Sequence, residues 1–67
     1  MPALADKLTQ LRAERGWSRE KVARAADITL TSYWRYETGR TTPGLDIAQR
    51  LAAVYGITVD ELLDPAA

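Results

Sequence analysis

The stretch SREKVARAADITLTSYWRYETGR, from Ser18 to Arg40, holds two short helical patterns separated by a turn. Ser18 is a typical N-cap residue, so it marks the start of the first helix. That helix should stop at Asp27, because Asp is one of the few residues other than Gly that accept the left-handed backbone of a turn. Thr29 caps the second helix, which should end at Gly39. The stretch therefore predicts two helices joined by the turn ADIT.

The sequence on either side of this stretch predicts three more helices. Leucines at positions i, i+4 and i+7 mark a first helix that should end near Gly16. A fourth helix is expected from about Leu45 to Tyr55. A fifth should follow Thr58, which stands three residues before Glu61 as in a capping box. We therefore expect an all-α, compact five-helix fold.

Length and composition limit the classes of fold and function. With 67 residues, the chain should form a single domain over residues 1–67, with its core in residues 8–63. The sequence contains no cysteine and no histidine, which removes disulfides, thiolate metal sites and the commonest metal ligand and general base. The Asp and Glu residues show no metal-ligand spacing and no pairing of a nucleophile with a base. We therefore expect no enzymatic activity, no metal and no cofactor.

Hydropathy and charge indicate where the protein acts. No apolar run approaches the roughly 20 residues of a membrane-spanning helix, and the N-terminus lacks a signal-peptide pattern, so we expect a cytoplasmic protein with no membrane partner. The formal net charge is zero, but residues 1–40 carry eight Lys and Arg against five Asp and Glu, and residues 41–67 carry one Arg against four acidic residues. The first part can therefore meet an anion while the second avoids it.

Three of the five aromatic side chains lie in the second helix of the opening stretch. Tyr33 and Tyr36 are three residues apart and trace its buried side, so we expect them in the core, with their hydroxyls reaching the rim. Trp34 lies about 100° away from Tyr33 around the helix and falls off that side.

Two short helices joined by such a turn, within an all-helical chain, are the layout of a helix-turn-helix. The motifs LRAERG at residues 11–16, ETGRTTP at residues 37–43 and YGITVDELL at residues 55–63 appear in a characteristic order and spacing. From Leu11 to Leu63, the sequence resembles the helix-turn-helix of the phage repressor and Cro type, also called the xenobiotic-response-element family. The resemblance implies a lambda-repressor-like fold and double-stranded DNA as the partner.

The same resemblance assigns roles to the elements. It implies that the first helix of the opening stretch crosses the DNA backbone, while the helix at about residues 30–37 enters the major groove. It also implies an ion pair between Arg12 and Glu37 that clamps the first helix of the chain to the third. The sequence departs from the family at Asp27, where Gly is usual, and at Trp34, where a small or polar residue is usual.

Side chains of the expected recognition helix are candidates for contact with the bases. Leu30 and Thr31 lie at its N-terminal end, the part that reaches base edges in this motif. Leu30 would meet a thymine methyl group unless it is buried in the core, and Thr31 would bond to a base or a phosphate. Arg35 would form the bidentate contact to guanine, with a phosphate or a neighbouring acid as the alternative. Trp34 completes the predicted base-reading set, but two interpretations of it remain open. Its ring contacts a sugar edge or a thymine methyl group, or it folds onto the neighbouring helix or covers a dimer contact.

Polar residues at helix ends and in the following loop are assigned to DNA phosphates. They are Arg19, Thr29, Thr38, Arg40, Thr41 and Thr42. Arg19 stands where the family most often has a Gln that holds a phosphate. If two subunits each neutralise about three phosphates, log K should fall with log salt at a slope of roughly −5.

We therefore expect a sequence-specific transcriptional regulator, acting as a repressor, that binds an inverted-repeat operator as a homodimer. The apolar residues of the C-terminal part would form the dimer interface, unless they pack in the core. They are Tyr55, Val59, Leu62 and Leu63. The alternative is a protein-interaction module, such as an antitoxin or bridging factor, with a protein partner and secondary DNA binding. Zero net charge and Trp34 favour that alternative.

Overall fold

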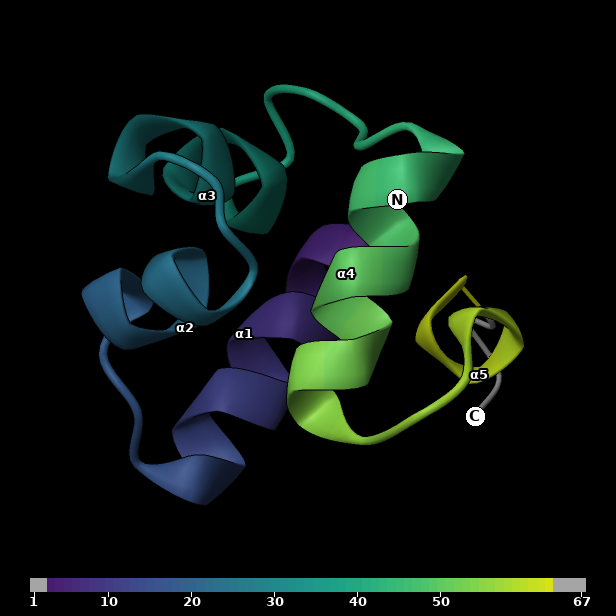
Figure 1. Cartoon of the computed structure of the whole chain (residues 1–67), viewed down its shortest axis with the longest axis horizontal. Helices are drawn as coiled ribbons and strands as arrows, with labels where there is room; N and C mark the ends of the chain where they lie inside the picture. The colour runs from purple at the N-terminus through teal and green to yellow at the C-terminus, as the bar shows by residue number, and fades with distance from the viewer. Residues whose placement is uncertain (1–2, 64–67) are drawn as a thin grey trace.

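The computed structural model describes residues 3–63, which fold into five helices without a strand. The helices are α1 (Ala3–Arg15), α2 (Arg19–Ala25), α3 (Leu30–Glu37), α4 (Leu45–Tyr55) and α5 (Val59–Leu63), as Figure 1 shows. The prediction of an all-α, five-helix fold is confirmed. The two helices of the opening stretch, α2 and α3, pack against each other, and α3 also packs on α1.

Side-chain caps determine where α2 and α3 begin. Ser18 Oγ accepts a hydrogen bond from the N–H of Lys21 at 3.1 Å, and Thr29 Oγ1 accepts one from the N–H of Ser32 at 3.0 Å. Each bond satisfies a backbone donor that the first turn of a helix leaves unpaired. Both helices therefore begin at the residues that the capping signals predict.

Residues with a left-handed backbone follow α1, α2 and α3. The φ angles are 67° at Gly16, 59° at Asp27 and 77° at Gly39. Gly adopts this conformation because it has no Cβ, whereas Asp tolerates it at some conformational cost. The turn at Asp27 redirects the chain within a few residues, and α3 packs against α2.

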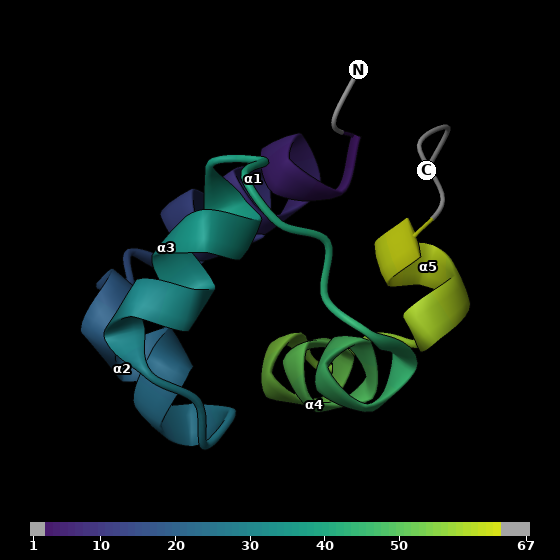
Figure 2. The same ribbon diagram turned by 90° about the horizontal axis from the view of Figure 1, so that it is seen from above.

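The capping box predicted at the start of α5 is present. The N–H of Glu61 donates to Thr58 Oγ1 at 3.0 Å, and Glu61 Oε1 accepts the N–H of Thr58 at 3.0 Å. The short helix packs against both α1 and α4, and Figure 2 shows it beside α4. The end of the described chain therefore covers the core from the side opposite α2 and α3.

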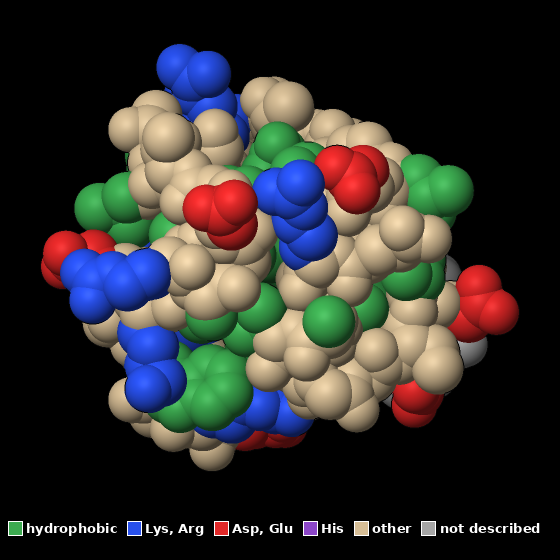
Figure 3. Space-filling model, in the orientation of Figure 1, with side chains coloured by type: hydrophobic (Ala, Val, Ile, Leu, Met, Phe, Trp, Pro, Cys, Tyr) green, Lys and Arg blue, Asp and Glu red, His purple; other side chains and the backbone are tan. Residues whose placement is uncertain are grey.

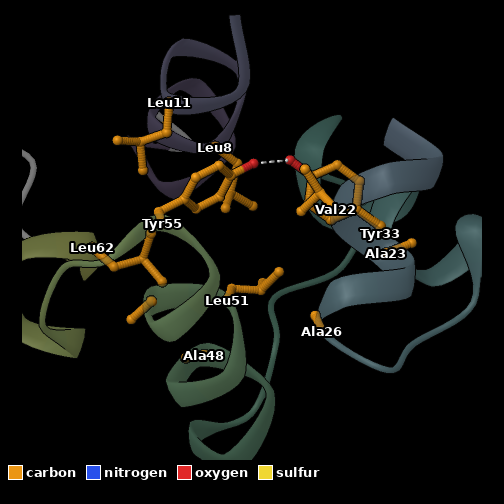
Figure 4. Packing of buried hydrophobic residues seen from close by; sticks show 11 residues of the cluster. Leu8, Leu11, Val22, Ala23, Ala26, Tyr33, Ala48, Leu51, Tyr55 and Leu62 are labelled. Atoms are coloured by element: carbon orange, nitrogen blue, oxygen red, sulfur yellow. Dashed lines mark hydrogen bonds between the residues drawn. The ribbon is translucent and has the colours of Figure 1, made fainter. Parts of the chain in front are cut away.

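All five helices contribute side chains to the core, which Figure 4 shows. Tyr33 enters it from α3 and is fully buried, as predicted, while Tyr36 is half-buried at its edge. The Tyr33 hydroxyl does not reach the rim as expected, because it bonds to the buried Tyr55 hydroxyl inside the core. The complete buried cluster comprises Leu8, Leu11, Val22, Ala23, Ala26, Tyr33, Ala48, Leu51, Ala52, Tyr55 and Leu62. The rings of Tyr33 and Tyr55 each bury a large apolar area, which matters in so small a core.

Two of the four residues predicted at a dimer interface lie in the core instead. Tyr55 is 3% exposed and Leu62 is 1% exposed. Trp17 stacks on Tyr55 with ring centroids 5.9 Å apart, and Arg15 donates to the Tyr55 carbonyl oxygen at 2.7 Å. Because the chain's own residues cover Tyr55 and Leu62, neither can contribute an apolar surface to a second copy.

Candidate nucleic-acid interface

Helix α3 has one buried side and one exposed side. Tyr33 and Glu37, both buried, hold it against the rest of the fold. The exposed side carries the four predicted base-reading residues Leu30, Thr31, Trp34 and Arg35. Leu30 is 45% exposed, so the alternative that it packs in the core does not hold.

An open groove runs between the start of α2 and the exposed side of α3. Its volume is 640 Å³. Apolar groups of Leu30 and Trp34 form part of its wall on α3, and the polar residues come mainly from the start of α2. The lining residues are Arg12, Ser18, Arg19, Glu20, Leu30, Thr31 and Trp34.

Arg12 and Glu37 form a bidentate ion pair between α1 and α3. Arg12 Nε lies 3.0 Å from Glu37 Oε2, and Arg12 Nη2 lies 2.8 Å from Oε1. A third donor of the same guanidinium, Nη1, bonds to the Trp17 carbonyl oxygen at 3.0 Å. Two parallel N–H donors on one carboxylate fix both distance and angle, so this pair clamps α3 to α1.

Arg19 is a second cation on the same carboxylate. Its Nε donates to Glu37 Oε1 at 3.3 Å, and its side chain remains 43% exposed. Among the described residues, its two terminal nitrogens have no hydrogen-bond partner. Arg19 is therefore held at its Nε while the outer end of the guanidinium faces the groove.

The environment of Glu37 favours its charged form. Burial acts against the charge most strongly, but the hydrogen bonds from Arg12 and Arg19, the charge of Arg12 and the nearby Tyr33 hydroxyl together outweigh it and hold the pKa of Glu37 below its usual value. The hydrogen bond with Glu37 likewise raises the pKa of Arg12. The cluster is thus a fixed set of charges at neutral pH.

Trp34 and Arg40 contact each other near the C-terminal end of α3. The Arg40 guanidinium carbon lies 4.9 Å from the centroid of the Trp34 ring, which is within range of a cation–π interaction. The Trp34 side chain is 37% exposed. It packs against the loop that follows its own helix, an arrangement that neither sequence-based interpretation included.

The four threonines assigned to phosphates differ in their surroundings. Thr29 Oγ1 bonds to both the N–H and the hydroxyl of Ser32, and Thr38 Oγ1 donates to the Trp34 carbonyl oxygen at 2.7 Å. These two hydroxyls therefore stabilise the ends of α3. Thr41 and Thr42 are exposed in the loop before α4.

The exposed apolar residues at the C-terminal side are fewer than the sequence predicted. Val59 is half-buried, and Leu63 is 47% exposed at the end of α5. Leu45, which sequence reasoning did not select, is 66% exposed at the start of α4.

The charges of the two parts of the chain also separate in space. On the face shown in Figure 3, Lys and Arg side chains predominate over α2 and α3, whereas the charged side chains over α5 are acidic. The groove and the exposed side of α3 therefore belong to the part of the chain with the positive balance.

The described residues contain neither a candidate metal site nor a candidate membrane-spanning helix. Residues 3–63 contain no group of Asp and Glu side chains arranged to hold a metal ion. No helix in this part of the chain is long and apolar enough to cross a membrane.

Residues 3–64 match the family model described as a helix-turn-helix domain. The chain is 44% identical over 61 residues to the HTH-type transcriptional regulator DdrOP3 of Deinococcus deserti. This match covers 91% of this chain and 47% of that protein. It is 34% identical over 59 residues to the cryptic phage CTXphi transcriptional repressor RstR of Vibrio cholerae, covering 88% of this chain and 53% of that one. The chain thus spans about half the length of these curated relatives.

A solved structure has the same arrangement of helices. The crystal structure of the hypothetical transcription factor NHTF from Neisseria superposes with a TM-score of 0.88 at 30% sequence identity. The match covers 94% of this chain and 72% of that one.

Proposed function

Since the chain belongs to the helix-turn-helix domain family, and the resemblance to its repressor and Cro type is confirmed, we propose that it binds double-stranded DNA in a sequence-specific manner and regulates transcription. Its function is that of a repressor that acts on an inverted-repeat operator as a dimer. The chain acts in the cytoplasm, as a single domain over residues 1–67 without catalytic activity.

One observation carries the proposal, namely the division of α3 into a buried and an exposed side. Glu37 and Tyr33 fix the helix on the body of the protein, which leaves Leu30, Thr31 and Arg35 directed outward. In this motif the N-terminal part of the second helix reaches base edges in the major groove. Leu30 meets a thymine methyl group, and Arg35 forms a bidentate contact with guanine O6 and N7.

Phosphate contacts flank this helix on both sides. Arg19 extends from the start of α2 with its outer nitrogens unpaired among the described residues, and Arg40 lies in the loop beyond α3. Thr41 and Thr42 are exposed in the same loop. Such contacts position the protein without selecting a sequence. Three phosphates on each subunit give the expected salt slope of roughly −5.

The dimer interface lies at the C-terminal side, where Val59 and Leu63 remain as apolar surface. A C2 interface brings the same patch of both copies together, and two recognition helices then stand about one helical turn, or 34 Å, apart on the DNA. The acidic residues Asp60 and Glu61 on α5 stay away from the phosphates in this arrangement.

A binding selection from random duplex DNA at about 150 mM salt tests the proposal. We expect recovery of an inverted repeat with half-sites about 10 base pairs apart from centre to centre. The matched variants are Arg35→Ala, which should alter the recovered sequence, and Lys7→Ala, which removes one positive charge near Glu61 of α5 and should not. If no sequence is enriched, the proposal is wrong and the protein-interaction module takes its place.

A further inference from the structure

We infer that Trp34 is a positioning residue: its ring holds Arg40 in place for a DNA phosphate and does not read a base. The inference rests on the proposed function. It changes the assignment of Trp34 from the base-reading set to the phosphate-binding set. It also explains a bulky aromatic side chain on the exposed side of α3.

The path of the chain after α3 brings Arg40 back over the helix. Gly39 has a φ of 77°, which reverses the backbone. The N–H groups of Arg40 and Thr41 then both donate to the Arg35 carbonyl oxygen, at 2.9 and 3.3 Å. The backbone of Arg40 is therefore anchored to the last turn of α3, and its side chain extends back to the Trp34 ring, 4.9 Å away.

The contact leaves the hydrogen-bonding groups of Arg40 available. Among the described residues, the Arg40 guanidinium makes no hydrogen bond or ion pair, and Trp34 is its only aromatic partner. A guanidinium stacks through its flat face, whereas its N–H donors point outward in the plane. Arg40 can thus remain on the Trp34 ring while it donates to a phosphate.

Holding Arg40 before DNA arrives favours binding. A free arginine side chain has many rotamers and loses that freedom when it is immobilised at an interface. Because the Trp34 ring already restricts Arg40, less freedom is lost on binding. The effect acts on a phosphate, which every sequence carries, so Trp34 contributes to affinity and not to base preference.

A double-mutant cycle on the selected duplex and on a scrambled duplex tests this inference. Trp34→Leu removes the ring but keeps an apolar side chain, Trp34→Phe keeps a ring, and Arg40→Ala removes the cation. We expect Trp34→Leu to weaken binding to both duplexes about equally, by about 2- to 5-fold, and Trp34→Phe to restore part of the loss. In the Arg40→Ala background, Trp34→Leu should have no further effect.

A measurement without DNA reports the contact directly. In NMR spectra of the free protein, the Arg40 Nε–H signal should be displaced by the ring current of Trp34 and return to its usual position in Trp34→Leu. Unchanged circular dichroism would show that each variant is folded.

Three outcomes overturn the inference. Trp34→Leu changes the base preference, or it weakens binding equally with and without Arg40, or it leaves the Arg40 signal unmoved. Each of these leaves the proposed function intact, provided that the wild-type protein binds its selected duplex. Failure of the wild-type protein to bind any duplex overturns the proposed function, and this inference with it.

Discussion

The hydroxyl oxygens of Tyr33 and Tyr55 lie 2.8 Å apart and share a hydrogen bond between α3 and α4, as Figure 4 shows. Tyr33 is 0% exposed and Tyr55 is 3% exposed, so water cannot replace either partner. Burial raises the pKa of both hydroxyls, which keeps them protonated and able to donate. The pair therefore ties α3, which carries the predicted base-reading residues, to the C-terminal half of the fold.

Removal of one hydroxyl of this pair should destabilise the protein. Tyr33→Phe leaves the Tyr55 hydroxyl buried without its partner, at a cost of about 1–3 kcal/mol. For a domain of this size, each kcal/mol lowers the Tm by about 4–8 °C. The double variant Tyr33→Phe, Tyr55→Phe should lose less than the sum of the two single variants, as measured by thermal unfolding. Additive losses would show that the hydrogen bond contributes nothing.

Acid should destabilise the protein through Glu37. Its pKa is lower in the folded than in the unfolded chain, so its charge stabilises the fold above about pH 4.3. This stabilisation is lost as the pH falls through the folded pKa. Urea unfolding between pH 7 and pH 3 should show the decline. The capping bonds of Glu61 lower its pKa as well, so Glu61→Gln serves as the control and should retain most of the decline. A flat profile in Glu61→Gln would exclude Glu37 as the cause.

The two arginines at the C-terminal end of α3 should differ in their effect on DNA binding. Arg35→Ala should relax the preference at one base position by about 1–3 kcal/mol. Arg40→Ala should weaken binding to all sequences alike and make the salt slope shallower by about 1. Affinities for single-base variants of the operator at several salt concentrations separate the two effects. Equal losses on every sequence for both variants would contradict the role of Arg35.

The left-handed turn at Asp27 should tolerate Gly better than Asp. Its φ of 59° disfavours a side chain with a Cβ, so Asp27→Gly should raise the free energy of unfolding by about 0.5–1 kcal/mol. Gly16→Ala provides the opposite test. The space around Gly16 is open within 4 Å, and only its φ of 67° resists the methyl group, so this variant should lose about 1 kcal/mol. Stabilisation by Gly16→Ala would contradict the conformational argument.

Adjacent leucines of α5 should respond in opposite ways to a charge. Leu63 is 47% exposed, so Leu63→Asp should shift the proposed dimer toward the monomer and leave the fold intact. Leu62 is 1% exposed, and Leu62→Asp should unfold the chain because the charge has no buried partner. Sedimentation and circular dichroism distinguish these results. A folded Leu63→Asp protein that keeps the wild-type oligomeric state would place the interface elsewhere.

The features that could be predicted from the sequence are those that depend on residues close together along the chain. Ser18, Thr29 and Thr58 begin helices because each side chain bonds to the backbone three residues ahead, and that bond needs no other part of the fold. The buried side of α3 also followed from helical spacing, as Tyr33 shows. Such signals determine which elements form and which sides are apolar.

Contacts between residues that are far apart in the sequence were harder to predict from it. An apolar stripe on α4 and α5 did not reveal that α1 and α4 cover Leu62, so Leu62 was assigned to a dimer interface. Arg19 reaches Glu37 only because α2 lies across α3, and Arg40 reaches Trp34 only because the chain reverses at Gly39. These geometries depend on how the helices pack, which periodicity does not specify.

The division of α3 into a buried and an exposed side lets target preference change separately from the fold. Tyr33 and Glu37 are buried and anchor the helix, whereas the side chains of Leu30, Thr31 and Arg35 are exposed and contribute little to the packing. A library that randomises the latter three positions should therefore contain mostly folded members with different preferred DNA sequences. If the proposed function holds, the exposed residues of α3 can be exchanged while the fold stays the same, and a few surface substitutions should give the protein a new operator.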